Sequence, residues 1–383
     1  MIDEIVISKN GGVVRVAGLA QKDLREFFVV DENGVNEGNI YLGKIVKKIQ
    51  TANGKEAFFV DVNDGKNAFV NAEERFLEDL NACEGQSVVV QVSQEKRAEK
   101  GARLTRFLQI AGKLLVYKPY GEEIVVSAKI VDEESRERLV DIVIKNTQAG
   151  GWTVRTAASE ATEEEIVSEI KFLEKKFDDV LEKAKSSKAP CLLAVNENTV
   201  NDYIVKNIEN INRVMVDNHL LENELKTVCD VVYNAKSFDD AGIDEMLQSA
   251  LQKTIKLDCG GRVIIEETKA FVAIDVDSGD ITAQGGLGRL NFEAAKEIAK
   301  QIILRNLSGK IIIDFAGMSD YKFLKKSIDV LEEELAEDEQ KAKVLGLSRA
   351  GNVEIIRNRK RPSLRDILTE ECSSCDGTGR VEK

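Results

Sequence analysis

The stretches Lys269-Ala-Phe-Val-Ala-Ile-Asp-Val-Asp277 and Lys310-Ile-Ile-Ile-Asp314 decide the fold of the last third of the chain. Each is a short, mainly apolar run that ends in aspartate, which predicts a buried β-strand. The segment Gly261-Arg-Val-Ile-Ile-Glu266 precedes the first run and predicts its partner strand in a hairpin. Helices are expected from Phe292 to about Asn306 and over Phe323–Glu337, so strands and helices alternate as in an α/β domain.

The aspartates at these strand ends are the candidate catalytic residues. Two carboxylates on adjacent strands offer oxygen ligands to a hard cation, and magnesium prefers one or two carboxylates together with water and substrate phosphate. Asp275 and Asp314 form such a pair, and Asp277 shares a strand face with Asp275 because the two are two positions apart. Aspartates at strand ends also cap loops and helices, so the pattern alone leaves both interpretations open.

The first third of the chain has the pattern of short strands joined by tight turns. Asn10-Gly-Gly and Asn33-Gly separate alternating apolar and polar runs, and residues 39–117 continue the pattern, which predicts a five-stranded barrel of the OB type. Phe59 and Phe69 fall on neighbouring strands of this barrel. If they are exposed, they are suited to stacking on bases; alternatively, both belong to the barrel core.

A candidate phosphate site follows in the middle of the chain. Trp152-Thr-Val-Arg155-Thr156 reads as a strand that ends in a planar guanidinium and a hydroxyl, a combination that fits a phosphate. The alternative is a surface arginine without a ligand. An amphipathic helix is expected from Thr162 to about Lys183, and strands alternate with helices over residues 191–250.

Length and composition exclude several classes of protein. With 383 residues, 43% apolar and 32% charged, the chain is expected to form two to four globular domains. We find no secretion signal and no apolar run that could cross a bilayer, so a cytoplasmic location is expected. His219 is the only histidine, which rules out ribonuclease chemistry based on two histidines of one chain and disfavours zinc catalysis through histidines.

The charge of the chain is segregated. The net charge is −13, yet residues 344–365 hold six basic residues against the single acid Glu354, and a second basic cluster lies between Lys96 and Arg106. Because phosphates feel charges only within a Debye length of roughly 8–10 Å, a polyanionic ligand is compatible with the acidic total.

The motif Cys372-Ser-Ser-Cys375-Asp-Gly-Thr-Gly379 has the spacing of half a zinc site. Zinc usually takes four ligands, and the chain has no second pair of this kind. Either a second protomer supplies the other two thiolates, or the pair is a redox motif or is unused. Its position near a chain end favours zinc shared between two chains. The other four cysteines are isolated and are interpreted as ordinary reduced thiols.

Several stretches together resemble the ribonuclease E/G family, and they occur in the family's order. They are Asn39-Ile-Tyr-Leu-Gly-Lys-Ile45, Ala57-Phe-Phe-Val-Asp61, Lys100-Gly-Ala-Arg-Leu-Thr105, Trp152-Thr-Val-Arg-Thr-Ala157, Ala273-Ile-Asp-Val-Asp-Ser278, Asn291-Phe-Glu-Ala-Ala295, Ile311-Ile-Ile-Asp-Phe315 and Arg361-Pro-Ser-Leu364, followed by the cysteine motif. The resemblance spans nearly the whole chain.

The resemblance implies a magnesium-dependent endoribonuclease that cleaves single-stranded RNA and leaves 5′-phosphate and 3′-hydroxyl ends, with roles in rRNA processing and mRNA decay. Asp275 and Asp314 would hold magnesium, with Asp277 beside them as a third catalytic residue. The RNA-binding residues implied are Phe59, Phe69 and Lys100 in the RNA channel, and Arg155 and Thr156 at the 5′-monophosphate. Cys372 and Cys375 would bind a zinc ion shared between the two chains of a homodimer.

The resemblance also implies a multidomain α+β and α/β fold, in which an OB-fold barrel is inserted in an RNase H-like domain and precedes a DNase I-like catalytic domain. The implied boundaries are 1–38 for the first part of the RNase H-like domain, 39–117 for the OB fold, 118–190 for a 5′-end sensor region with a long helix, 191–250 for the second RNase H-like part, 251–370 for the catalytic domain and 371–383 for a zinc-link tail.

Three departures from the family pattern define the alternatives. The family usually has asparagine at the position of Asp277, the loop between Asp277 and Asn291 looks short, and the chain stops soon after the cysteine motif, so a dimer rather than a tetramer is expected. The first two departures motivate a rival function, a non-catalytic RNA-binding or ribosome-assembly protein of the same fold. A more distant rival is a zinc-assembled protein-interaction module.

Overall fold

The chain forms two structural units, one of which is built from both ends of the sequence. In the computed structural model, residues 1–29 and 207–383 make up the first unit, and residues 30–206 make up the second. The residues described are 1–51, 54, 56–71, 83–96, 100–196, 199–226, 228–279, 284–317, 321–336, 338–375 and 379. No helix within these residues is long and apolar enough to cross a membrane.

Segments from opposite ends of the first unit share one sheet. Its strand order is β15-β14-β1-β2-β3, in which β1 pairs antiparallel with β2 and parallel with β14. The strands are β1 (Glu4–Asn10), β2 (Val13–Ala20), β3 (Asp23–Asp31), β14 (Arg213–Val216) and β15 (Val231–Tyr233). Helices α5 (His219–Leu225), α6 (Ser237–Asp240) and α7 (Ile243–Ala250) come from the same part of the chain as β14 and β15. The pairing of β1 with β14 joins the start of the chain to residues more than 200 positions later.

The predicted five-stranded barrel is confirmed in the second unit. Its strands follow the order β4-β5-β6-β8-β7, and β7 pairs again with β4 to close the barrel. The bounds are β4 (Ile40–Gln50), β5 (Glu56–Asp61), β6 (Ala68–Asn71), β7 (Ser87–Gln94) and β8 (Arg103–Thr105), with β13 (Cys191–Ala194) added at β4. Side chains such as Phe58, Val60 and Val90 fill the barrel interior, as their alternation along the strands requires.

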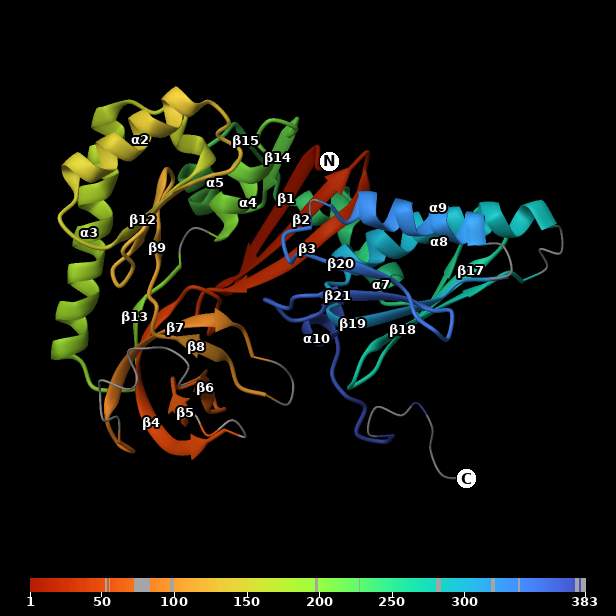
Figure 1. Ribbon diagram of the computed structural model, residues 1–383, viewed down its shortest axis with the longest axis horizontal. Coiled ribbons are helices and arrows are strands. Elements are labelled where there is room, and N and C mark those ends of the chain that lie inside the picture. The colour runs from red at the N-terminus through yellow and green to blue at the C-terminus, as the bar shows by residue number, and fades with distance from the viewer. Residues whose placement is uncertain are drawn as a thin grey trace. The chain divides into compact units, whose positions relative to one another are not determined.

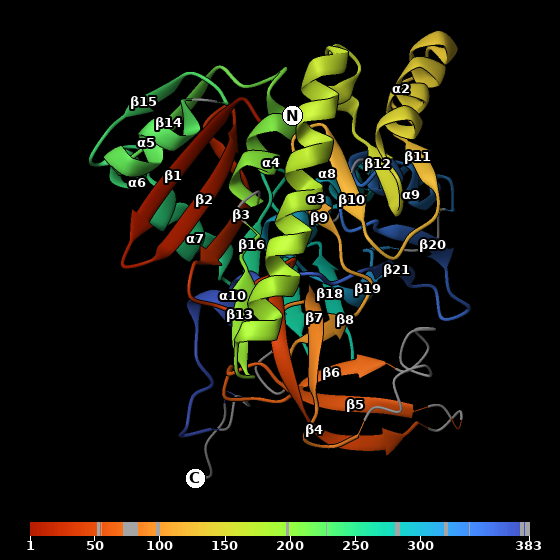
Figure 2. The same ribbon diagram turned by 90° about the vertical axis from the view of Figure 1, so that its left-hand side faces the viewer.

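A smaller sheet and three helices complete the described part of the second unit. Its strand order is β11-β12-β10-β9, with β9 (Ile110–Ala111), β10 (Leu115–Lys118), β11 (Ile124–Val126) and β12 (Gly151–Val154). The helices are α2 (Glu133–Asn146) and α3 (Glu163–Ser186), which Figure 2 shows beside this sheet, and the short α4 (Thr199–Asn207). Helix α3 confirms the predicted amphipathic helix. A capping box between Thr162 and Glu165 starts it, and Ile166, Ile170 and Leu173 are buried.

The last third of the chain forms a six-stranded sheet covered by helices on one face (Figure 1). The order is β16-β17-β18-β19-β21-β20, with β16 (Thr254–Lys256), β17 (Arg262–Glu267), β18 (Val272–Asp277), β19 (Gly309–Asp314), β20 (Lys343–Leu347) and β21 (Val353–Arg357). The helices are α8 (Gln284–Leu304), α9 (Tyr321–Glu334) and α10 (Leu364–Leu368). The hairpin of β17 and β18 and the strand β19 are where the sequence predicts them. Helix α8, however, begins eight residues before the predicted start at Phe292, because Leu287 and Leu290 pack against the core of this sheet.

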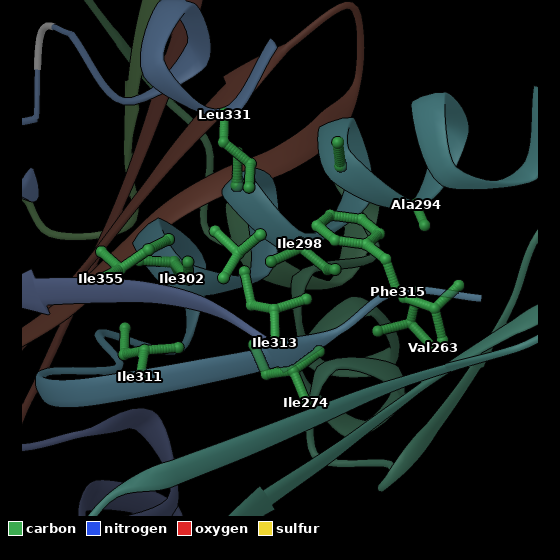
Figure 3. Packing of buried hydrophobic residues seen from close by; sticks show 14 of the residues in the cluster. Val263, Ile274, Ala294, Ile298, Ile302, Ile311, Ile313, Phe315, Leu331 and Ile355 are labelled. Atoms are coloured by element: carbon green, nitrogen blue, oxygen red, sulfur yellow. The ribbon is translucent and has the colours of Figure 1, made fainter. Parts of the chain in front are cut away.

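The apolar core beneath α8 and α9 fixes which side chains of the sheet face outward. Ile274 of β18 and Ile313 of β19 point toward Ile298 of α8 and Leu331 of α9, as Figure 3 shows. Since successive side chains of a strand alternate between faces, the residues next to these isoleucines lie on the opposite face. Two of those outward-facing residues are the aspartates singled out in the sequence.

Candidate active site

Asp275 and Asp314 lie next to each other on the face of the six-stranded sheet opposite helices α8 and α9. Strands β18 and β19 are parallel, and their register places Asp275 beside Asp314. Both side chains are exposed, whereas Ile274 and Ile313, one position earlier, are fully buried. Each strand ends within two residues of its aspartate. The buried parts of the strands therefore hold both carboxylates in place while leaving them open to solvent.

The surroundings of Asp275 disfavour its charged form. Burial raises the pKa of this carboxyl above its ordinary value, and the charges of Asp314 and Asp277 raise it further, whereas Arg262 opposes them. The residue opposite Asp275 on β17 is the apolar Ile264. A bound cation would relieve this repulsion between neighbouring carboxylates.

Asp277 differs from the other two aspartates because its carboxylate is already paired. Arg262 stands directly opposite it on β17 and donates from Nε at 2.8 Å and from Nη2 at 2.5 Å to its Oδ2 atom. The backbone N–H of Gly279 donates to Oδ1 at 2.8 Å. The hydrogen bond from Gly279 and the guanidinium of Arg262 lower the pKa of Asp277 below its ordinary value. Arg262 lies in the predicted hairpin but was not predicted as a site residue.

A buried asparagine fixes the loop that follows Asp314. The amide of Asn291, on α8, donates to the carbonyl of Ala316 at 2.7 Å and accepts from the N–H of Ala316 at 3.1 Å. Its side chain is almost fully buried. Helix α8 thereby holds the backbone two residues after Asp314, which defines where the second carboxylate of the pair stands.

The donor set of the pair fits a magnesium ion. Carboxylate oxygens at neighbouring strand ends are hard ligands, and magnesium usually keeps several water or phosphate ligands in addition. No described residue donates a hydrogen bond to Asp275 or Asp314, so their oxygens are available. Within the described residues, no group of three or more histidine, cysteine or acidic side chains is arranged to hold a metal. Asp275 and Asp314 would supply two protein ligands to such an ion.

In the second unit, Arg155 and Thr156 stand beside the small sheet, immediately after β12. Nη1 of Arg155 donates to the carbonyl of Gly112 at 2.6 Å and to Oδ1 of Asp202, on α4, at 2.8 Å. The hydroxyl groups of Thr156 and Ser127 lie 2.9 Å apart. The predicted phosphate site therefore contains the two residues named from the sequence and a further hydroxyl, but its arginine already has a carboxylate partner. Ser127 and Asp202 were both missed.

Phe59 and Phe69 lie on the outside of the barrel, so the interpretation that both belong to its core is wrong. The rings are half-buried, 5.8 Å apart between centroids and in edge contact. The strand registers place Lys47 opposite Phe59, Phe59 opposite Phe69, and Phe69 opposite Arg103. Lys47 and Arg103 are exposed, so a row of two aromatic rings between two cations crosses four strands. Lys100, also exposed, precedes β8 by three residues.

The cysteine pair forms a tight turn at the end of the chain. The N–H of Cys375 donates to the carbonyl of Cys372 at 3.3 Å, and the N–H of Gly379 donates to Sγ of Cys375 at 3.3 Å. Hydrogen bonds from Ser374 and Cys375 lower the pKa of the exposed Cys372 thiol. N–H groups that point at sulfur stabilise thiolates, which are the form that binds zinc. The pair supplies two of the four ligands that zinc usually takes.

The basic residues near the chain end are largely occupied within the fold. Arg357 is buried and donates to both oxygens of Asp338 at 2.8 Å. Arg359 contacts Asp366 and Ser308, and the guanidinium of Arg361 lies 4.4 Å from the ring centre of Phe28. These three arginines therefore make contacts within the first unit of the chain.

The sequence is similar to those of known ribonucleases. A sequence profile of the ribonuclease E/G family matches residues 109–360. The chain is 32% identical to the protein named Ribonuclease G from Haemophilus influenzae in an alignment of 422 residues that covers 99% of this chain and 84% of that protein. Ribonuclease G from Escherichia coli K12 is 30% identical, with 100% of this chain and 85% of that protein covered. A Ribonuclease E from Synechocystis is 29% identical over the whole chain, which spans 60% of its length.

Proposed function

The chain belongs to the ribonuclease E/G family, and we propose that it is a magnesium-dependent endoribonuclease with Asp275 and Asp314 as its metal ligands. It cleaves single-stranded RNA to products with 5′-phosphate and 3′-hydroxyl ends, and it acts in the cytoplasm in rRNA processing and mRNA decay. The observation that carries the proposal is the placement of two open carboxylates side by side at the ends of two parallel strands.

The residues around the carboxylate pair have distinct tasks in this proposal. Asp275 and Asp314 bind and orient the metal from two adjacent strands, and Asn291 keeps the second of them in position through the backbone of Ala316. Magnesium would supply an activated water and would offset the charge of the phosphodiester. No histidine lies in this sheet or its helices, since His219 is the only one in the chain, so the acid–base work falls to water and carboxylates.

RNA binding in this proposal uses the barrel and the small sheet of the second unit. Phe59 and Phe69 stack on bases, and Lys47 and Arg103 at the two ends of the row attract the phosphates on either side. Lys100 adds a further cation before β8. Arg155 and Thr156 bind a 5′-monophosphate, and the Ser127 hydroxyl beside Thr156 adds a further donor.

The finer fold and assembly assignments belong to the same proposal. The barrel is an OB fold inserted in an RNase H-like domain whose parts are β1–β3 and the segment that carries β14 and β15, and the six-stranded sheet is a DNase I-like catalytic domain. Cys372 and Cys375 of two chains hold one zinc ion, which joins a homodimer. The two thiols and the N–H groups directed at them support this part of the proposal.

A cleavage assay tests the function directly. The purified protein is incubated with single-stranded RNA, with magnesium and with excess chelator, and the product ends are mapped. We expect cleavage only with magnesium, and its loss in Asp275→Asn and Asp314→Asn. Asp217→Asn is the matched control, because Asp217 also follows a strand of the first unit, β14, but caps the N–H of Lys9. If wild-type protein binds RNA and cleaves none at any magnesium concentration, the non-catalytic RNA-binding alternative is correct.

A further inference from the structure

The ion pair between Arg262 and Asp277 separates one carboxylate from the other two at the proposed metal site. Arg262 is the first residue of β17 and Asp277 the last of β18, and they stand directly opposite each other. Arg262 donates twice to Oδ2, and Gly279 donates to Oδ1. Both oxygens of Asp277 are thus occupied by donors from the chain itself.

The strand register gives Asp275 a different neighbour. Its partner on β17 is Ile264, which has no donor, and its partner on β19 is Asp314. Asp277 shares the outward face with Asp275, since the two are two positions apart on one strand. Without Arg262, three carboxylates would therefore lie on this edge of the sheet, and Asp277 would have no cation opposite it on β17.

The charge at the site differs accordingly. With the ion pair formed, the open carboxylates Asp275 and Asp314 carry a charge of about −2, which one divalent cation balances. If the Arg262 charge were removed, the local charge would approach −3, which would bind cations more strongly and repel the phosphates of RNA. The ion pair is only partly shielded from water, with 52% of the Arg262 side chain and 32% of the Asp277 side chain exposed. Its contribution to stability is therefore small, and its effect on the neighbouring site is the more consequential one.

We propose that Arg262 is a positioning residue of the metal site, which binds Asp277 and thereby restricts the ligands to Asp275 and Asp314. This inference rests on the proposed function, because it presupposes a metal at that pair. In this arrangement Asp277 accepts hydrogen bonds from Arg262 and Gly279 and does not bind the cation directly.

Binding of Mn²⁺ to the full chain, measured by electron paramagnetic resonance without RNA, tests the inference together with kcat and KM for RNA cleavage. In Arg262→Met, Asp277 is released, so we expect Mn²⁺ affinity to rise and the KM for RNA to rise, each on the order of tenfold for one added charge. In Asp277→Asn, the unpaired Arg262 remains, so Mn²⁺ affinity should fall. In the double variant both charges are absent, and we expect affinity and KM within about twofold of wild type, because the pair is electrically neutral.

The matched control is Arg213→Met. Arg213 makes the same kind of cross-strand ion pair, donating from Nε at 3.0 Å and Nη2 at 2.5 Å to Glu4 between β14 and β1, away from the aspartates. It should leave Mn²⁺ affinity unchanged. The positioning role of Arg262 is wrong if Arg262→Met and Asp277→Asn change Mn²⁺ affinity in the same direction, or if Arg262→Met behaves like Arg213→Met. RNA cleavage by the wild-type protein would leave the proposed function standing in that case. If wild-type protein binds no Mn²⁺, or if Asp275→Asn does not reduce the Mn²⁺ binding, the proposed function and this inference both fail.

Discussion

Asn291 and Ala316 are joined by two complementary hydrogen bonds, in which the side-chain amide of one residue pairs with the backbone of the other. The contact ties helix α8 to the loop behind Asp314. It occurs at a buried position, where an unsatisfied backbone group costs about 1–3 kcal/mol. The proposed active site therefore depends on a residue that does not itself face the metal.

Asn291→Ala is predicted to lower the cleavage rate by more than its effect on stability alone would explain. Loss of both hydrogen bonds frees the loop that positions Asp314, so we expect kcat to fall at least tenfold and the magnesium requirement to increase. The measurement is kcat as a function of magnesium, alongside the free energy of unfolding. Gln301→Ala is the control, because Gln301 is also buried and hydrogen-bonded on α8 but contacts Glu297 and Arg305. Equal activity in the two variants would contradict the prediction.

Phe59→Ala and Phe69→Ala are predicted to weaken binding of single-stranded RNA. Loss of one stacked base costs about 1–3 kcal/mol, which corresponds to a roughly 5- to 150-fold higher Kd. Phe172→Ala is the control, since this exposed phenylalanine lies on α3 of the same unit. Fluorescence anisotropy with a short labelled RNA measures the Kd. If all three substitutions change the RNA affinity equally, the barrel is not part of the RNA-binding site.

The cations at the ends of the aromatic row are predicted to act through salt-dependent attraction. Lys47 and Arg103 flank the two rings on strands β4 and β8. Each phosphate contact contributes about 0.7 to the slope of log affinity against log salt for single strands. Lys47→Ala and Arg103→Ala should each reduce the slope by about this amount, whereas Phe59→Ala should leave it unchanged. Titrations at several salt concentrations give the slope, and unaltered slopes in both cation variants would exclude these contacts.

Arg155→Ala and Asp202→Asn are predicted to shift the preference for a 5′-monophosphate in opposite directions. The guanidinium is bound to Asp202, and a phosphate must compete with that carboxylate. Removing the carboxylate charge should increase the ratio of cleavage rates for 5′-phosphorylated over 5′-hydroxyl RNA, and removing the arginine should bring the ratio to one. Asp141→Asn, on α2 of the same unit, is the control. A ratio that Arg155→Ala leaves unchanged would show that the phosphate binds elsewhere.

The elements that could be predicted from sequence are those that a local pattern of residues determines. Two apolar runs that each end in aspartate predicted β18, β19 and the pair Asp275–Asp314. The pairing of Arg262 with Asp277 was within reach, because a hairpin turn between Thr268 and Phe271 fixes that register. The apolar runs that end in aspartate mark only the carboxylates, and the residue opposite each carboxylate is identified only when the two strands are paired.

The remaining features depend on contacts between distant residues. Arg155 and Asp202 are 47 positions apart, and no local pattern connects them. The first two turns of α8 contain three glycines, which disfavour a helix, yet Leu290 packs into the core and tertiary packing prevails. Arg357 looked like part of a basic surface, but Asp338 holds it inside the fold. Burial of a charged side chain could not be deduced without its partner.

A further prediction concerns the cysteine pair. If two chains share one zinc ion through Cys372 and Cys375, metal analysis should return about one zinc per two chains, and analytical ultracentrifugation should show a dimer. Cys372→Ser and Cys375→Ser should each remove both the zinc and the dimer, whereas Cys83→Ser, at an exposed cysteine of the second unit, should change neither. One zinc per chain, or a dimer that persists without the metal, would contradict the shared site.

The last prediction concerns the buried ion pair between Asp338 and Arg357, which supports the strand beside β19. Only 3% of each side chain is exposed, and Nη1 of Arg357 also donates to Asn306 and to the carbonyl of Leu307. Burial alone would raise the pKa of Asp338, but the Arg357 guanidinium and backbone N–H groups lower it below its ordinary value. Asp338→Asn leaves the arginine without its counter-charge, which should cost about 3–5 kcal/mol.

The pH dependence follows from the lowered pKa of Asp338. A carboxylate whose pKa falls on folding stabilises the fold at pH values above the unfolded pKa of about 3.9, and this contribution disappears as pH falls through the folded pKa. The difference between wild type and Asp338→Asn should therefore be constant near neutral pH and shrink below about pH 4. Because the only tryptophan, Trp152, is in the other unit, hydrogen exchange at β19 and β21 is the suitable measurement. Asp244→Asn, which breaks an exposed ion pair with Arg15, should cost less than about 1 kcal/mol. A difference between wild type and Asp338→Asn that stays the same at pH 3 would show that the carboxylate charge of Asp338 does not stabilise this sheet.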